Sequence, residues 1–147
     1  MRKNTAVPIA CVTALGLLAG AADASEASSC HNRGVLLAAR GAYEEALAPL
    51  RRALELEDAA DTHEALGLTF LNLGSNQAAL AEYELALAGG RKSAATRFNR
   101  GLALERLGRR SEAAEAYRDA LAADASFAPA QAGLRRIDGG GRASRRP

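Results

Sequence analysis

The chain has 147 residues, of which 48% are hydrophobic and 24% charged, and its formal net charge is +2. The charge is uneven: residues 25–134 hold 12 basic and 15 acidic side chains, whereas five arginines follow from Arg135 onward. A body this close to neutral excludes a nucleic-acid interface, and its length suffices for one domain and not two.

The first 24 residues are typical of a cleavable export signal. Arg2 and Lys3 precede an uncharged, mostly apolar run over residues 6–22, which ends in the small residues Ala22-Asp23-Ala24. An uncleaved anchor helix is the alternative. Glycines and a proline interrupt the run, however, and it falls short of the roughly 20 apolar residues that a membrane span requires. We therefore expect a signal peptide over residues 1–24, no transmembrane segment after cleavage, and a periplasmic or secreted protein.

Cysteine usage raises the question of a covalent link in the exported protein. Cys11 lies within the predicted signal, so that Cys30 would be left without an intramolecular partner. An odd cysteine suggests an intermolecular disulfide or a lipid anchor. The preceding Ala27-Ser28-Ser29 differs from the Leu-Ala-Gly type of sequence that precedes a lipidated cysteine, so we expect no lipid at Cys30. A free thiol that packs as a small apolar side chain remains the simplest interpretation.

The middle of the chain repeats three times with a period near 34 residues. Each unit contains a glycine within a helical apolar stripe, a second glycine seven residues later, and then an alanine. The first glycines are Gly34, Gly67 and Gly101, the second are Gly41, Gly74 and Gly108, and the alanines are Ala46, Ala79 and Ala113. A fixed period of this length, with helical spacing inside it, predicts an array of two-helix repeats.

The spacing predicts an all-α fold, an α-solenoid of three helix-turn-helix repeats with a C-terminal capping helix. The repeats are expected at about residues 27–59, 60–93 and 94–127. The predicted helices are residues 27–40, 43–56, 60–73, 76–88, 93–107, 110–123 and 127–137. The second glycine of each unit is expected to end a helix in the left-handed conformation. The first glycine is expected to face the alanine of its unit across a close helix crossing. The basic tail, residues 138–147, is predicted to be disordered.

Residues 27–137 resemble the tetratricopeptide repeat family, in particular small exported bacterial members. The glycine pairs and the alanine of each unit carry the resemblance. The aromatic position early in the first helix departs from it, because Cys30, His63 and Arg97 occupy that position. The resemblance implies a right-handed superhelix whose concave face, built from the first helix of each unit, binds an extended peptide or a partner's helix.

By position, the resemblance also implies a set of groove-lining side chains. They are Asn32, Val35, Leu68, Leu71, Asn72, Phe98, Asn99, Leu102, Glu105 and Arg106, with His31, Ala39 and Glu64 beside them. Chaperone cofactors of the family bind a terminal carboxylate with lysines, an arginine and asparagines, and most of that set is missing here. The leucines and Phe98 indicate instead an apolar groove for an internal peptide segment.

No motif in the sequence indicates catalysis, a cofactor or a metal. His31 and His63 each lack a second plausible ligand on the same helix face. There is no nucleophile elbow and no phosphate-binding glycine loop. We therefore expect a non-enzymatic module that binds a protein or peptide partner in cell-envelope assembly or secretion, without cofactor or nucleic acid. The alternative is a structural repeat protein that self-associates and has no separate partner.

Export generates the first prediction. The mature protein isolated from the cells that produce it is expected to begin at Ser25, because signal peptidase cleaves after the second small residue of an A-x-A site, here Ala24 of Ala22-Asp23-Ala24. N-terminal sequencing measures this directly. Recovery of the full chain with Met1 from the cytoplasmic fraction would contradict export.

Overall fold

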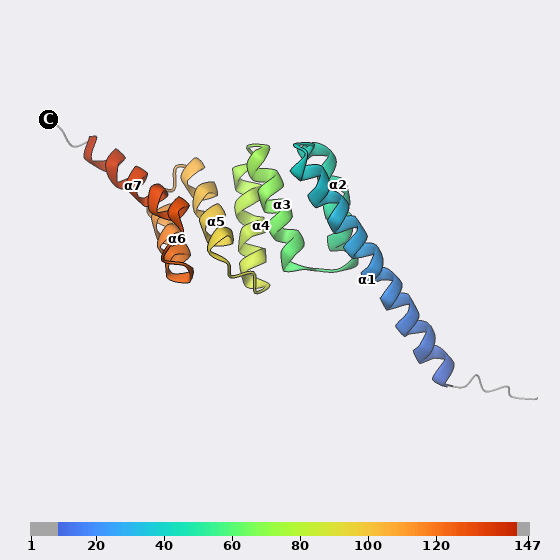
Figure 1. Ribbon diagram of the computed structural model, residues 1–147. Coiled ribbons are helices and arrows are strands. Elements are labelled where there is room, and N and C mark those ends of the chain that lie inside the picture. Colours follow the sequence, from blue (N-terminus) through green and yellow to red (C-terminus); the bar gives the residue numbers. More distant parts are fainter. Residues whose placement is uncertain (1–8, 144–147) are drawn as a thin grey trace, which may run out of the picture.

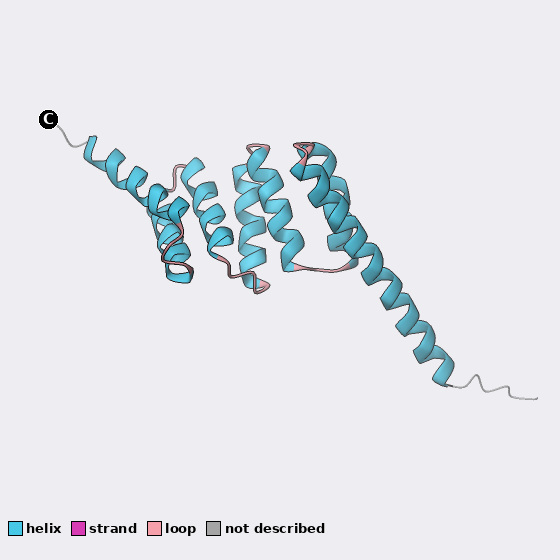
Figure 2. Ribbon diagram, in the orientation of Figure 1, coloured by secondary structure: helices cyan, strands magenta, loops and turns pink. Residues whose placement is uncertain are grey.

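A computed structural model describes residues 9–143 of the chain, with side chains described for residues 22–139. Seven helices and no strand occur in the described range (Figures 1 and 2). They are α1 (Ile9–Ala39), α2 (Tyr43–Leu56), α3 (Ala60–Asn72), α4 (Asn76–Ala88), α5 (Ala94–Arg106), α6 (Arg110–Ala123) and α7 (Ala128–Ala143). Helices α2 to α6 begin and end within one residue of the predicted ranges, so the all-α repeat fold is confirmed.

The two terminal helices are longer than predicted. Helix α1 begins at Ile9, not at residue 27, and its first half extends away from the array (Figure 1). Helix α7 continues to Ala143, so residues 138–143, predicted to be disordered, are helical. No proline occurs in residues 138–143, and adding residues to an existing helix is easier than nucleating a new one. Residues 1–8 of the predicted signal and residues 144–147 of the tail lie outside the described residues.

The helices are arranged in two layers. Each helix packs against the next one in the chain, and in addition α1 contacts α3, α3 contacts α5, and α5 contacts α7. Within the described part of the chain, α2, α4 and α6 make no such contacts with one another. The odd-numbered helices are therefore the closely spaced inner layer, and the array curves toward them. This arrangement makes the face of α1, α3 and α5 the hollow one.

The predicted glycine turns are confirmed. Gly41, Gly74 and Gly108 have φ angles of 80°, 77° and 78°, in the left-handed region that favours glycine. After Gly41, the Ala42 N–H donates to the Leu37 carbonyl at 3.0 Å, a bond that closes the end of the helix back on its last turn. Gly90, with a φ of 99°, makes the same turn between α4 and α5, and the sequence analysis missed it.

The helix crossings pair each first glycine with a larger residue than predicted. A Cβ added to Gly67 would lie 2.9 Å from Cε1 of Tyr83, and one added to Gly101 would lie 2.6 Å from Cε1 of Tyr117. At Gly34 the corresponding neighbour is Leu50, at 2.4 Å from its Cγ. The prediction that these glycines directly face alanines is thus corrected at Gly67 and Gly101, whereas at Gly34 the predicted Ala46 is also a neighbour, with its carbonyl oxygen 3.3 Å from the added Cβ.

The cause of this difference is the direction of helical side chains. A side chain on a helix leans toward the N-terminus and covers the preceding turn. The ring of Tyr83 therefore covers the level of Ala79, four residues earlier, and meets Gly67 there. Ala79 itself is fully buried, and its small size leaves room for the ring.

Helix α7 is joined to the core through the same kind of contact. A Cβ on Gly133 would lie 2.6 Å from Cε2 of Tyr117, so this ring is held between glycines of α5 and α7. Tyr117 belongs to a core cluster that extends from Leu71 to Ala130, and a smaller cluster contains Ala46, Leu50 and Leu66. Phe70 packs against both clusters and links them.

The glycine–tyrosine contact generates a stability prediction. Gly101→Ala is expected to lower the free energy of unfolding by about 1–3 kcal/mol, because the new methyl group overlaps the Tyr117 ring. Gly139→Ala in α7 is the matched control, since a Cβ there meets nothing within 4 Å. Alanine has the higher helix propensity, so this control is expected to be neutral or stabilising by up to about 1 kcal/mol. Chemical denaturation measures both values, and equal effects at the two positions would contradict the crossing.

Candidate functional site

A hollow follows α1 and α3 along the inner face and reaches the end of α2 and the α2–α3 connection. It consists of three adjoining cavities with volumes of about 310, 270 and 310 Å³. The first two share His31 and Asp61, and the second and third share Val35, Ala65 and Leu68. We call this surface the inner trough. Its main lining residues are His31, Val35, Ala39, Tyr43, Glu57, Asp61, Glu64, Ala65, Leu68, Asn72, Arg91 and Asn99.

One end of the inner trough is apolar. Val35 of α1 and Leu68 of α3 are 41% and 44% exposed, and both side chains line the third cavity. Ala39 lies one helical turn after Val35, and Asn72 lies one turn after Leu68, so each pair shares a helix face. Tyr43 of α2 closes this end. The result is an aliphatic surface with an amide group at its border.

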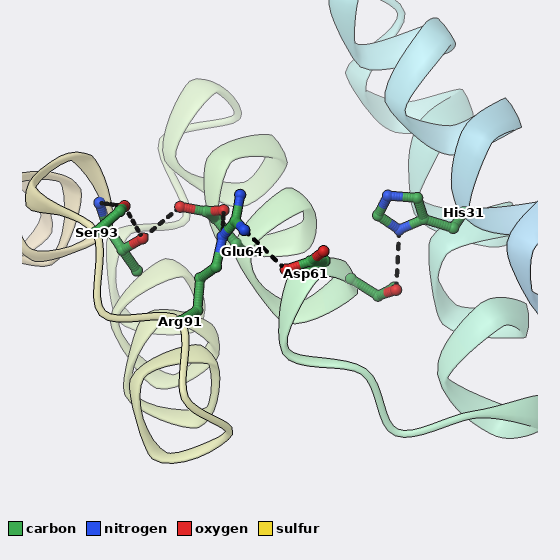
Figure 3. A network of polar contacts seen from close by, with 7 residues as sticks. His31, Asp61, Glu64, Arg91 and Ser93 are labelled. Carbon is green, nitrogen blue, oxygen red and sulfur yellow. Dashed lines mark hydrogen bonds and ion pairs between the residues drawn. The ribbon is translucent and has the colours of Figure 1, made fainter.

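The other end carries a polar network (Figure 3). The Arg91 guanidinium donates from Nε to Glu64 Oε2 at 2.6 Å and lies 3.2 Å from Asp61 Oδ1 through Nη1. The Thr96 hydroxyl donates to the second oxygen of Glu64, and the Ser93 and Thr96 hydroxyls lie 2.7 Å apart. The network therefore ties the start of α3 to the start of α5.

Two further details define the electrostatics of this end. His31 Nδ1 and Thr62 Oγ1 lie 2.9 Å apart, which links α1 to α3 (Figure 3). The hydrogen bond that Arg91 donates to Glu64, and then the charges of Glu64 and Asp61, raise the pKa of the Arg91 guanidinium above its ordinary value. Arg91 is therefore a permanent cation that is already bound by two carboxylates.

The C-terminal part of the inner face is closed by α7. Arg136 of α7 donates to both carboxylate oxygens of Glu105, at 2.7 and 2.6 Å, and the Tyr117 hydroxyl donates to Glu105 Oε2 at 2.6 Å. The hydrogen bond from Arg136 lowers the pKa of Glu105. Arg106 donates from Nη1 to the Leu71 carbonyl at 2.7 Å. Glu105 and Arg106 thus hold helices together, a role that the sequence analysis did not assign to them.

Three apolar residues expected in the groove pack against the core instead. Leu71 is only 4% exposed, and Leu102 is half-buried against the same cluster. Phe98 stacks on Tyr117, with ring centroids 5.4 Å apart, and meets the edge of Phe127 at 5.7 Å. The expectation that these side chains line an open groove is corrected. The physical reason is tertiary packing. Phe127, in the segment that leads into α7, contacts Phe98, whereas Leu71 is buried in the core cluster that joins α3 to α4, α5 and α6.

The remaining predicted groove residues do lie together. His31, Val35, Ala39, Glu64, Leu68, Asn72 and Asn99 all line the inner trough, and Asn32 lines its first cavity. Four residues near the polar end were not predicted from the sequence: Asp61, Arg91, Ser93 and Thr96. These residues lie where one repeat meets the next, outside the regular apolar pattern, and only their position at the repeat junctions could have indicated them.

Metal-binding and membrane-spanning features were also sought in the described residues. No group of three or more histidine, cysteine or acidic side chains in that range could hold a metal ion. His63 instead hydrogen bonds to Glu82 and Asp58, both at 2.7 Å. Burial lowers the pKa of His63, but these two carboxylates more than offset it, so that the pKa is raised. None of the described helices combines the length and the apolar character required to cross a membrane.

Comparisons with known sequences agree with the repeat assignment. Residues 27–56 and residues 94–127 match family models described as tetratricopeptide repeat. These stretches correspond to the first and third predicted repeats. The comparison with curated proteins found no match. The two matches support the tetratricopeptide repeat family for this chain.

Solved structures show the same fold. The TPR domain of Arabidopsis OM64 has a TM-score of 0.76 and 22% identity, covering 78% of this chain and 96% of that domain. The second TPR domain of human RPAP3, solved in complex with the HSP70 peptide SGPTIEEVD, has a TM-score of 0.75 and 20% identity. The match covers 79% of this chain and 98% of that domain. Pseudomonas aeruginosa pilF has a TM-score of 0.67 and 28% identity, covering 79% of this chain and 54% of that one. The fold of the chain is therefore a TPR-like solenoid.

The aromatic cluster beside α5 generates a prediction. Phe98→Ala is expected to destabilise the fold by roughly 2–3 kcal/mol, because the change removes contacts with Tyr117 and Phe127. Thermal or chemical unfolding measures the loss. A variant with an unchanged unfolding midpoint would show that Phe98 contributes nothing to packing, and would support the expectation that Phe98 lines the groove.

Proposed function

We propose that this protein is an interaction module that holds a peptide segment of a partner protein in the inner trough. The observation that carries the proposal is the exposure of Val35 and Leu68 side by side in one hollow. Binding sites in proteins are typically concave and mostly apolar, with a few polar groups that orient the ligand. The third cavity of the trough has this composition. Asn99 in the second cavity offers an amide group for a peptide backbone, and Asn72 offers its side-chain oxygen, since its Nδ2 donates to the Leu68 carbonyl at 2.8 Å.

The structural neighbours support peptide binding as the general mode. The RPAP3 domain has been solved with a bound peptide, although its 20% identity relates only its fold to that of this chain. A shared fold does not transfer a partner. The place where a segment binds is therefore inferred from the exposed residues of this chain alone, and the structure favours the α1–α3 half over the part that α7 covers.

We further propose a non-catalytic role. The hydroxyl and carboxylate groups at the polar end, those of Ser93, Thr96 and Glu64, hydrogen bond to one another. A nucleophile or a general base requires a free partner position at which a substrate atom can bind. The chemistry of this site therefore fits recognition better than reaction.

Export and a role in cell-envelope assembly or secretion belong to the same proposal. The side chains of residues 22–25 are all exposed. Proceeding along the chain from there, the ion pair between Glu26 and Arg52 at 3.0 Å and the buried Ala27 are the first described contacts with the array. Cleavage after Ala24 would leave these contacts intact, which is the arrangement expected of a removable leader.

A paired substitution tests peptide binding in the trough. A random seven-residue peptide library displayed on phage is selected against the folded wild-type protein, and the enriched peptide is synthesised with a fluorescent label. Leu68→Ser is expected to weaken its binding about tenfold or more, as for a buried contact residue at an interface. Leu85→Ser is the matched control, because Leu85 is 50% exposed on the outer helix α4.

Fluorescence anisotropy measures the dissociation constants, and melting curves verify that both variants stay folded. Both leucines are exposed, so neither change opens a cavity in the core. Failure to enrich any peptide, or equal losses with Leu68→Ser and Leu85→Ser, would contradict peptide binding in the inner trough.

A further inference from the structure

The inner trough has a charge gradient along its length. Three carboxylates, those of Glu57, Asp61 and Glu64, line its first two cavities, and Arg91 is the one cation among the described lining residues. The third cavity, around Val35 and Leu68, has no charged lining residue within the described range. The trough is therefore acidic at one end and apolar at the other.

Arg91 does not neutralise the acidic end. Its Nε is bound to Glu64 at 2.6 Å and its Nη1 lies 3.2 Å from Asp61, so two carboxylates share one positive charge. No described cationic side chain lies within ion-pair distance of Glu57. The side chain of Asp61 is 64% exposed, which leaves it open to a second cation. A net negative potential therefore remains where the first two cavities meet.

The dimensions of the inner trough limit the size of its occupant. Its α1 side extends from Ala27 to Ala39. At a rise of 1.5 Å per residue this stretch is roughly 18 Å long. An extended chain advances about 3.3 Å per residue, so about six extended residues span the trough.

We propose that the inner trough binds a basic-and-apolar segment of a partner protein, about six extended residues long. A lysine or arginine side chain of the segment lies against Glu57 and Asp61, and aliphatic side chains about three or four residues away contact Val35 and Leu68. This proposal rests on the proposed function and specifies its ligand. Charge complementarity is the reason for choosing a basic segment as the ligand, because carboxylates without a full complement of cations attract a cation and select against acidic partners.

The same charges disfavour acidic segments. A peptide such as SGPTIEEVD, which the human RPAP3 domain holds, has three carboxylate side chains near its end. Against Glu57 and Asp61 these would meet like charges, and like-charge contacts at an interface select against the wrong partner. The trough of this chain is therefore expected to select a ligand of opposite charge to that peptide.

The composition of the selected peptides tests the assignment. Library selection against the wild-type protein is expected to enrich peptides that have Lys or Arg separated from Leu, Ile, Val or Phe by a few residues. The enriched peptide is synthesised together with a version in which Glu replaces its basic residue, and SGPTIEEVD serves as a third probe. The Glu version and SGPTIEEVD are expected to bind at least about tenfold more weakly than the selected peptide.

Substitutions in the protein locate the charge contact. Glu57→Gln and Asp61→Asn together are expected to weaken binding of the basic peptide about fivefold, in line with a partly exposed ion pair. They are also expected to reduce the dependence of binding on salt concentration. Glu115→Gln, on the outer helix α6, is the control with the same chemical change and is expected to have no effect. Glu57→Gln alone is measured as well, because it leaves both Arg91 ion pairs intact.

The outcomes separate the two proposals. Enrichment of acidic or uncharged peptides that still require Leu68 would overturn the charge assignment and leave peptide binding in place. Equal affinity of the Glu57→Gln/Asp61→Asn variant and the wild type for a basic peptide would overturn it as well. If no peptide of any composition is enriched, both proposals are contradicted.

Discussion

The contact between a large side chain and a glycine on the facing helix sets the geometry of the whole array. Tyr83 lies on Gly67 and Tyr117 lies on Gly101, and Leu50 occupies the equivalent place on Gly34. A glycine has no side chain, so the helices approach closely enough for the ring or leucine to fill the crossing. Because no single hairpin buries enough surface alone, the stacking of these crossings gives the array its stability.

The repetition of this contact also determines which part of the inner face stays open. Tyr117 is covered on its second side by Gly133 of α7, and the Glu105–Arg136 ion pair fixes that helix over the C-terminal end of the array. At the N-terminal end no equivalent helix of the described residues covers Val35 and Leu68. The openness of the α1–α3 half therefore follows from where the capping helix packs. The charge gradient of the trough has a separate cause, the carboxylates of Glu57, Asp61 and Glu64 at one end.

Much of the fold could be predicted from the sequence, because the period of the glycines and the apolar stripe are local signals. The turns at Gly41, Gly74 and Gly108 follow from the same signals. The candidate site could be predicted only in part. Leu68 and Leu71 lie on the same helix, yet the first is exposed and the second is buried. Which face of α3 meets α5 depends on how the hairpins pack. The burial of Phe98 could not be predicted either, because its contact with Phe127 joins distant parts of the chain.

Mapping a bound peptide on the full chain by NMR tests the central claim most directly. The labelled protein is titrated with the enriched basic peptide, and the backbone amide shifts are followed. We expect the largest changes at Val35, Ala65 and Leu68, while the amides of Phe98 and Glu105 stay nearly unchanged. Changes centred on Phe98, Glu105 and Arg136 would contradict the claim, since they would show that the partner displaces α7 and binds at the C-terminal end of the inner face.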